Sequence, residues 1–270
     1  MPIIVNKQLE LEKTKENRLS IQADLNGFSF SVVNDSANKV LFMYQSDFSC
    51  ERGHYDFFLK NTAQLIDSFT LLSSIFKKVN IIIDTCKYAL VPKQLYKEED
   101  AFQHLSNLHS LDELDEIDTV EVPGQDIIIL FAVSSTLINQ IKKVQPEFRL
   151  FPSIYPIISQ VADFQDHNKI FFRYHKGHIH LIAYEGSRLV YCNSFPAIHF
   201  NTALYFLLLT QKQVQFNPEL TTVYVSGNIK DFEIMDISKY FSKIKYFRNP
   251  RIPLGSPEIE LKFSSLTFEL

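Results

Sequence analysis

Apolar and polar residues alternate along several short stretches in the first half of the chain, and turn residues bound each stretch. An alternation with a period of two predicts β-strands that bury one face, whereas apolar residues at steps of three, four and seven predict an amphipathic helix. The pattern predicts, in order, strands at 19–24, 28–33 and 40–44, a long helix at 55–76 and a buried parallel strand at 79–83.

The same order of elements recurs in the second half. The pattern there predicts strands at 170–174, 178–184 and 189–192, a helix at 199–209 and a buried strand at 222–226. Gly27 and Gly177 fall at the matching hairpin turns, so that Gly-Phe-Ser-Phe-Ser-Val-Val aligns with Gly-His-Ile-His-Leu-Ile-Ala. A long β-β-β-α-β unit that occurs twice predicts paired lobes rather than a solenoid. We therefore expect an N-terminal lobe over 1–165 and a C-terminal lobe over 166–270.

A segment of different pattern separates the two halves. It predicts a helix at 92–108, an exposed acidic stretch at 111–118, strands at 119–122 and 127–133, and a helix at 135–144. A short strand at 148–151 and a helix at 152–164 then lead into the second half. We expect the segment from about 92 to 150 to form a small β/α subdomain inserted in the first lobe.

Several stretches are similar to one known superfamily. They are Ile127-Ile128-Ile129-Leu130-Phe131-Ala132-Val133, the exit Phe148-Arg149-Leu150-Phe151-Pro152-Ser153, the strand and turn Val223-Tyr224-Val225-Ser226-Gly227, and Leu90-Val91-Pro92. With the duplication, they resemble the actin-like ATPases, most of all the pilus-assembly and secretion-platform branch. The chain also looks like an uncharacterised bacterial family of unknown function with this fold. The resemblance implies an α/β chain of the actin-like (ribonuclease H-like) type with two duplicated lobes.

Glycine is scarce, with 7 residues in 270, and this limits the loops that can hold a phosphate, because such loops need glycine for close backbone approach. The resemblance implies a nucleotide site whose remnants are Asp24, Asn26, Gly27, Asp84, Lys176, Gly177, Ser226, Gly227 and Asn228. Each has a structural alternative. Asn-Gly and Lys-Gly are ordinary hairpin turns, and an Asp after a strand commonly forms a turn.

Family ATPases open each lobe with an Asp at the hairpin, which helps to hold phosphates and magnesium. The first lobe offers Asp24-Leu25-Asn26-Gly27, whereas the second offers Tyr174-His175-Lys176-Gly177, with no acidic residue at the matching point. We therefore expect a degenerate site and a non-catalytic binding or assembly module. No cofactor is expected, although weak binding of Mg-ATP stays open. The alternative is an active Mg-ATP-binding ATPase in which Asp24 holds magnesium.

Other features of the chain narrow the choice of partner and location. His175, His178 and His180 form the densest histidine cluster and, with Glu185, offer a weaker alternative, a metal site. Cys50, Cys86 and Cys192 are too widely spaced for a disulfide framework or a zinc motif. The net charge of −4 argues against nucleic acid, and we find no segment long and apolar enough to span a bilayer. We expect a cytoplasmic protein with a protein partner.

Overall fold

The computed structural model describes residues 2–6, 9–24, 27–47, 55–175 and 177–270. The chain forms two compact units, one of residues 1–155 with 269–270, and one of residues 156–268. Among the described residues, none of the helices is long and apolar enough to cross a membrane. The two units are described in turn.

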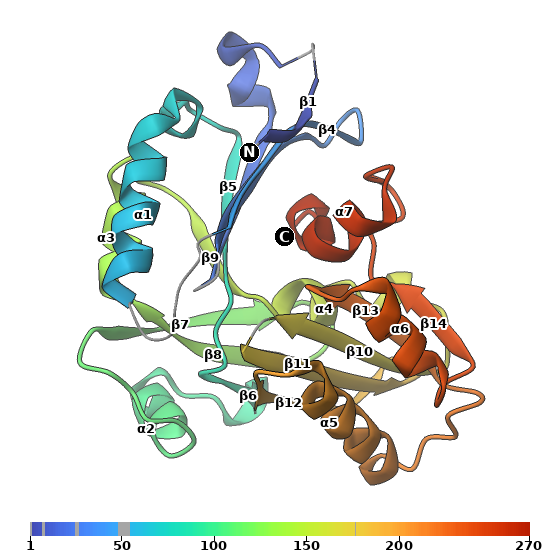
Figure 1. Ribbon diagram of the computed structural model, residues 1–270. Coiled ribbons are helices and arrows are strands. Elements are labelled where there is room, and N and C mark those ends of the chain that lie inside the picture. Colours follow the sequence, from blue (N-terminus) through green and yellow to red (C-terminus); the bar gives the residue numbers. More distant parts are fainter. Residues whose placement is uncertain (1, 7–8, 25–26, 48–54, 176) are drawn as a thin grey trace. The chain divides into compact units, whose positions relative to one another are not determined.

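The first unit is built on a six-stranded sheet with the order β1-β4-β3-β2-β5-β9. Its strands are β1 (Pro2–Val5), β2 (Arg18–Asp24), β3 (Gly27–Asn34), β4 (Lys39–Asp47), β5 (Lys78–Ile83) and β9 (Arg149–Pro152). Strands β2, β3 and β4 pair antiparallel, and β5 runs parallel to both β2 and β9. Helices α1 (Tyr55–Ser68) and α3 (Ser135–Lys142) cover one face of this sheet (Figure 1).

The inserted segment has a sheet of its own. Strands β6 (Tyr88–Pro92), β8 (Ile127–Ser134) and β7 (Asp115–Val122) form it in that order, with antiparallel pairing throughout. Two short 3-10 turns, η3 (Lys93–Leu95) and η4 (Glu98–Asp100), lead to helix α2 (Ala101–Ser106). The predicted strand at 127–133 is confirmed. The predicted helix at 92–108 is wrong in its first half, because Pro92 ends β6 by pairing with Ile127.

The second unit has a five-stranded sheet with the order β12-β11-β10-β13-β14. The strands are β10 (Asn168–His175), β11 (Gly177–Glu185), β12 (Arg188–Ala197), β13 (Thr222–Gly227) and β14 (Lys243–Tyr246). Helices α4 (Tyr155–Ser159), α5 (Phe200–Gln213), α6 (Asp231–Ser238) and α7 (Pro257–Phe263) belong to this half, together with the 3-10 turns η5 (Val161–Asp163) and η6 (Ser264–Thr267). Helix α5 packs its Ala203 and Leu207 against β10 and β11.

The two sheets share one topology. The order β4-β3-β2-β5-β9 matches β12-β11-β10-β13-β14 in both neighbours and strand directions. The second strand of each series also carries a register shift at the same place, after Val32 in β3 and after Ala183 in β11. The duplication predicted from the sequence is therefore present in the strand pairing.

The register corrects the alignment of the two halves by one residue. Asp24 pairs with Gly27 across the first hairpin, and His175 pairs with His178 across the second. Position 24 therefore corresponds to 175, a shift of 151, and Gly27 corresponds to His178 rather than to Gly177. The shift matters because side chains alternate between the two faces of a strand, so a slip of one residue reverses every face. With the corrected shift, buried Phe28 and Phe30 match buried Ile179 and Leu181.

The long helix predicted at 55–76 is wrong beyond Ser68, where α1 ends. Phe69 is extended, and a short 3-10 turn, η2 (Thr70–Ser73), follows it. The ring of Phe69 packs edge-on against Phe30 and Tyr44, with centroids 5.3 and 4.5 Å apart. This contact with the sheet takes Phe69 out of the helical path. The helix predicted at 152–164 is likewise shorter, because only α4 and η5 form there.

Candidate functional site

The first hairpin lies where β2 and β3 meet. Asp24 ends β2 and Gly27 begins β3, and the two residues pair through their backbones. Asn26 and the side chain of Asp24 lie outside the described residues. Their roles at a nucleotide therefore stay a prediction.

Asp84 follows β5 directly and is tied into the first unit. The Ser153 hydroxyl donates a hydrogen bond of 2.5 Å to Asp84 Oδ1, and the Asp84 amide donates to the carbonyl of Ala23 at 3.1 Å. Ser153 in turn follows β9, the neighbouring parallel strand. Asp84 therefore links the ends of three strands. Its carboxylate thus has a structural role, one of the two alternatives that the sequence analysis gave for it.

The second hairpin joins β10 to β11 and shows why Gly177 is present. Its φ is +112°, a conformation that side chains rarely adopt, and open space surrounds the position where a Cβ would stand. The turn itself thus requires glycine here. Lys176, the other predicted phosphate contact at this hairpin, lies outside the described residues. The residue that corresponds to Asp24 is His175, which is only 4% exposed, and not Tyr174 as the sequence alignment implied.

Ser226, Gly227 and Asn228 end β13, as predicted. Gly227 has a φ of +101°, and a Cβ on it would lie 2.0 Å from the carbonyl oxygen of Tyr174. The Asn228 amide donates to that same carbonyl at 2.8 Å. The glycine is therefore required because two backbones approach closely, which explains it without a ligand. Asn228 holds the same place as Asp84, because each donates its amide to the matching residue of the neighbouring strand.

A hollow of about 460 Å³ lies beyond the end of β13. Asn228, Lys230, Tyr246 and Lys262 line it together with the carboxylates of Asp231 and Glu258. The Lys230 amide that begins α6 donates to Glu233 Oε2 at 2.8 Å. The hollow has the size of a small-molecule site, but its mixed charges show no built cradle for a triphosphate.

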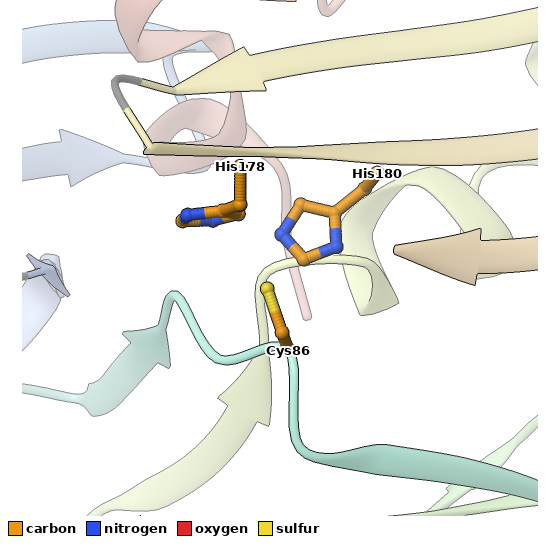
Figure 2. A group of neighbouring side chains, drawn as sticks. All are labelled: Cys86, His178 and His180. Carbon is orange, nitrogen blue, oxygen red and sulfur yellow. The ribbon is translucent and has the colours of Figure 1, made fainter. Parts of the chain in front are cut away.

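The histidines of the second unit gather on one face of its sheet. His178 and His180 leave β11 on the same side, as Figure 2 shows, with ring centroids 4.9 Å apart. His180 is fully buried, and its Nδ1 lies 2.6 Å from the Ser194 hydroxyl. Glu185 lies at the far end of β11 and pairs with Arg188. The predicted completion of a metal site by Glu185 is therefore wrong.

Buried cations are the feature that the sequence analysis missed. Three Lys or Arg side chains in the described part of the chain are buried, namely Arg18, Lys169 and Arg173. Arg18 donates to Asp35 and to Ser20, whereas the Lys169 ammonium donates to the carbonyls of Phe164, Asp166 and Gly186 at 2.8 to 2.9 Å. Arg18 and Lys169 each lie at the start of a strand, out of phase with its core positions, and this is their signal in the sequence, whereas Arg173 lies near the end of β10 and has none.

A second network joins Asp166 to its neighbours. Tyr224 and Lys245 both donate to the Asp166 carboxylate, Lys245 at 2.9 Å. Burial opposes the charge of Asp166, but hydrogen bonds from Tyr224 and Lys245 outweigh it and lower the pKa of Asp166 to about 2. The same burial and bond raise the pKa of Tyr224. The three groups hold the start of β10 against β13 and β14.

Comparison with known proteins places these features in a family. The model of a family described as "Protein of unknown function (DUF3822)" matches residues 6–249. No curated protein matches the chain. Among solved structures, a Bacteroides thetaiotaomicron protein "with actin-like ATPase fold and unknown function" has a TM-score of 0.82 at 22% identity, covering 97% of this chain and 100% of that one.

Two more distant structures share the fold. A chain of the "PilM-PilN type IV pilus biogenesis complex" has a TM-score of 0.60 at 12% identity, covering 94% of this chain and 97% of that one. The ethanolamine utilization protein EutJ of Carboxydothermus hydrogenoformans has a TM-score of 0.50 at 9% identity, covering 98% and 93%. At these identities the likeness shows the fold alone. The predicted actin-like ATPase fold is confirmed.

Proposed function

Because the chain belongs to the DUF3822 family and has the actin-like ATPase fold, we propose that it is a non-catalytic binding or assembly module with a degenerate nucleotide site. One observation carries the proposal. The second unit has His175 at the position of Asp24, so the second hairpin has a histidine where the first has an aspartate.

This exchange weakens magnesium chemistry for a physical reason. Mg²⁺ is a hard cation that binds oxygen ligands, in most nucleotide sites one or two carboxylates together with the phosphates. An imidazole supplies nitrogen and, once protonated, a positive charge that repels the ion. Gly227 and Asp84 also have structural uses, because Gly227 admits the Tyr174 carbonyl and Asp84 accepts from Ser153. We propose that the chain needs no cofactor and binds Mg-ATP weakly at most.

Helix α5 supports a role in binding another protein. It is apolar on nearly all sides, yet Tyr205 and Leu209 are 60% and 43% exposed one turn apart. Apolar side chains exposed together commonly mark an interaction surface. The PilM–PilN neighbour is itself part of a protein complex. We propose a protein partner rather than nucleic acid, and a cytoplasmic location.

The second candidate is an active Mg-ATP-binding ATPase, and two observations favour it. Asp24 stands at the end of β2, at the hairpin where magnesium would bind. The hollow beyond Asn228, of about 460 Å³, is large enough for a nucleoside. In this reading Asp24 holds the metal, and the glycine-containing turns contact the nucleotide.

Titration calorimetry with Mg-ATP and Mg-ADP, together with an assay of phosphate release, distinguishes the non-catalytic binding module from the active ATPase. We expect no hydrolysis and a Kd weaker than about 100 μM, because each missing charge-assisted hydrogen bond costs about 1.5–3 kcal/mol and ~1.4 kcal/mol is tenfold in affinity. A Kd below about 10 μM that Asp24→Ala abolishes would establish the ATPase instead. His175→Asp is the matched variant, since it restores a carboxylate to the second hairpin.

A further inference from the structure

Arg173 differs from the other two buried cations. Its side chain is 1% exposed, and its one hydrogen bond in the described structure runs from Nη1 to the Ser265 hydroxyl at a long 3.4 Å. Among the described residues, no hydrogen-bond partner exists for Arg173 Nε or Nη2. Arg18 and Lys169 are each fully compensated by an anion or by carbonyls. Within the described part of the chain, Arg173 thus carries a buried charge with no ion-pair partner.

Such a charge has a large energetic cost. An arginine cannot relieve this cost by losing its proton, because the guanidinium group stays protonated in proteins. A buried ion is tolerated in proteins when it is paired and hydrogen-bonded. The idle edge of Arg173, Nε with Nη2, is the edge of the guanidinium fork that binds two oxygens of a carboxylate or phosphate in parallel.

The sheet surrounds this edge with further polar groups. In the pairing register, Arg173 lies opposite His180 on β11 and opposite Ser226 on β13, and His180 lies opposite Ser194 on β12. Residues that pair directly point to the same face. A polar row therefore crosses four strands on the face away from α5, and Ser265 of η6 lies over it.

The equivalent row of the first unit carries no cation among its described residues. The residues that correspond to Arg173 and His180 are Gln22 and Ser29, which pair with each other in the same way and carry no charge. The framework thus folds with a neutral residue at this position, so the shared topology does not itself require a cation here. The charge of Arg173 calls for an explanation other than the fold.

We propose that Arg173 binds a small oxyanion, a phosphate or a carboxylate group, on this face of the second unit. Nε and Nη2 of Arg173 donate to two of its oxygens. Ser265, whose hydroxyl lies 3.4 Å from Nη1, and Ser226, which pairs with Arg173 across the sheet, flank the site. The site shares Ser226 with the nucleotide remnants, but it is centred on Arg173 and does not depend on the proposed function.

Thermal unfolding of the full chain tests the proposal in inorganic phosphate, acetate and chloride at matched ionic strength. We expect phosphate or acetate, at about ten times its Kd, to raise the Tm by roughly 3–6 °C over chloride. Arg173→Gln, which gives the second unit the residue of the first, should abolish the rise. Arg188→Gln, which neutralises an exposed arginine of β12, should retain it. The better of the two anions identifies the chemical class.

A second measurement covers an anion held too tightly to exchange. Dialysed protein is denatured with acid, and the anions that it releases are quantified. The natural chain is compared with Arg173→Gln. If that variant does not fold, Arg173→Lys takes its place. Close to one oxyanion per natural chain, and markedly less per variant, supports the site. Absence of both the Tm rise and the released anion overturns it, as does a rise that Arg173→Gln leaves intact.

Discussion

Arg18 and Lys169 occupy the same position in the two units, each as a buried cation that starts the first strand of the duplicated hairpin. Arg18 pairs with Val33 and Lys169 with Tyr184, at equal distance from the turn. Arg18 donates to the Asp35 carboxylate, and Lys169 donates to the carbonyl of Gly186, the residue that corresponds to Asp35. The duplication thus preserved the cation and its place of contact while the chemistry of the contact changed.

Replacing Lys169 should therefore be costly. Lys169→Met fills the same space but leaves the carbonyls of Phe164, Asp166 and Gly186 without their buried donor. We expect a loss of about 2–4 kcal/mol in the free energy of unfolding, because buried acceptors without partners cost about 1–3 kcal/mol each. Urea denaturation measures it. Lys239→Met, which removes an exposed lysine, should change the same quantity by less than about 0.5 kcal/mol.

Gly227→Ala should destabilise the second unit far more than an ordinary glycine substitution. A Cβ at position 227 would overlap the Tyr174 carbonyl, which belongs to rigid backbone. We expect a loss of at least about 3 kcal/mol, through strain that the sheet cannot relieve. Gly255→Ala is the matched control, because Gly255 also has a positive φ but faces open space. Its loss should stay near about 1 kcal/mol, and equal losses at the two positions would contradict the role given to the Tyr174 contact.

Acid should weaken the protein through Asp166. Its pKa is lowered from 3.8 to about 2 in the folded chain, so the unfolded chain takes up the proton first as the pH falls. The stabilisation by ionised Asp166 is complete above about pH 4 and is lost as the pH falls to about 2. Asp166→Asn should remove this part of the acid dependence, which urea unfolding at several pH values measures. Tyr224→Phe should shift the loss to higher pH, because it removes one donor to the carboxylate.

The exposed face of α5 should matter for partner binding and not for stability. Tyr205→Ser combined with Leu209→Ser removes two exposed apolar side chains, so the free energy of unfolding should change by no more than about 0.5 kcal/mol per site. Affinity capture from the native host should then lose the protein that the natural chain retrieves. Phe102→Ser with Leu108→Ser, at exposed apolar positions of the inserted segment, should still retrieve it. Equal retrieval by both variants would place the contact elsewhere.

Much of the fold follows from local pattern. Period-two alternation located the strands of both hairpins, and the repeated order revealed the duplication, because each half buries one face of an equivalent sheet. The alignment was wrong by one residue because the two hairpins use their glycines differently. Gly27 pairs with Asp24 across the first hairpin, whereas Gly177 lies between the paired residues His175 and His178 of the second. Sequence alone does not reveal which residue closes a hairpin.

The remaining features of the fold and of the candidate site could not be predicted, because they depend on contacts between residues far apart in the sequence. Helical periodicity continued past Ser68, but Phe69 is drawn to Phe30 and Tyr44 on the sheet. In the sequence Gly227 resembles a glycine that faces a ligand, but in the structure it faces the Tyr174 carbonyl of the neighbouring strand. Arg173 gave no signal in the sequence, because a cation in a strand is usually solvated, whereas this one is buried and contacts Ser265 of η6. The roles assigned to Asp24, Asn26 and Lys176 stay predictions.

The inserted sheet has a consequence for the order of folding. In the first unit, Asn80 of β5 pairs with Arg149 of β9, so this pairing waits until the whole inserted segment has been placed. In the second unit, Thr222 of β13 pairs with Lys243 of β14, across little more than one helix. Contacts that close long loops form later, because the chain entropy is lost before the contact stabilises it. The second unit is therefore expected to complete its sheet sooner, although its residues come later in the chain.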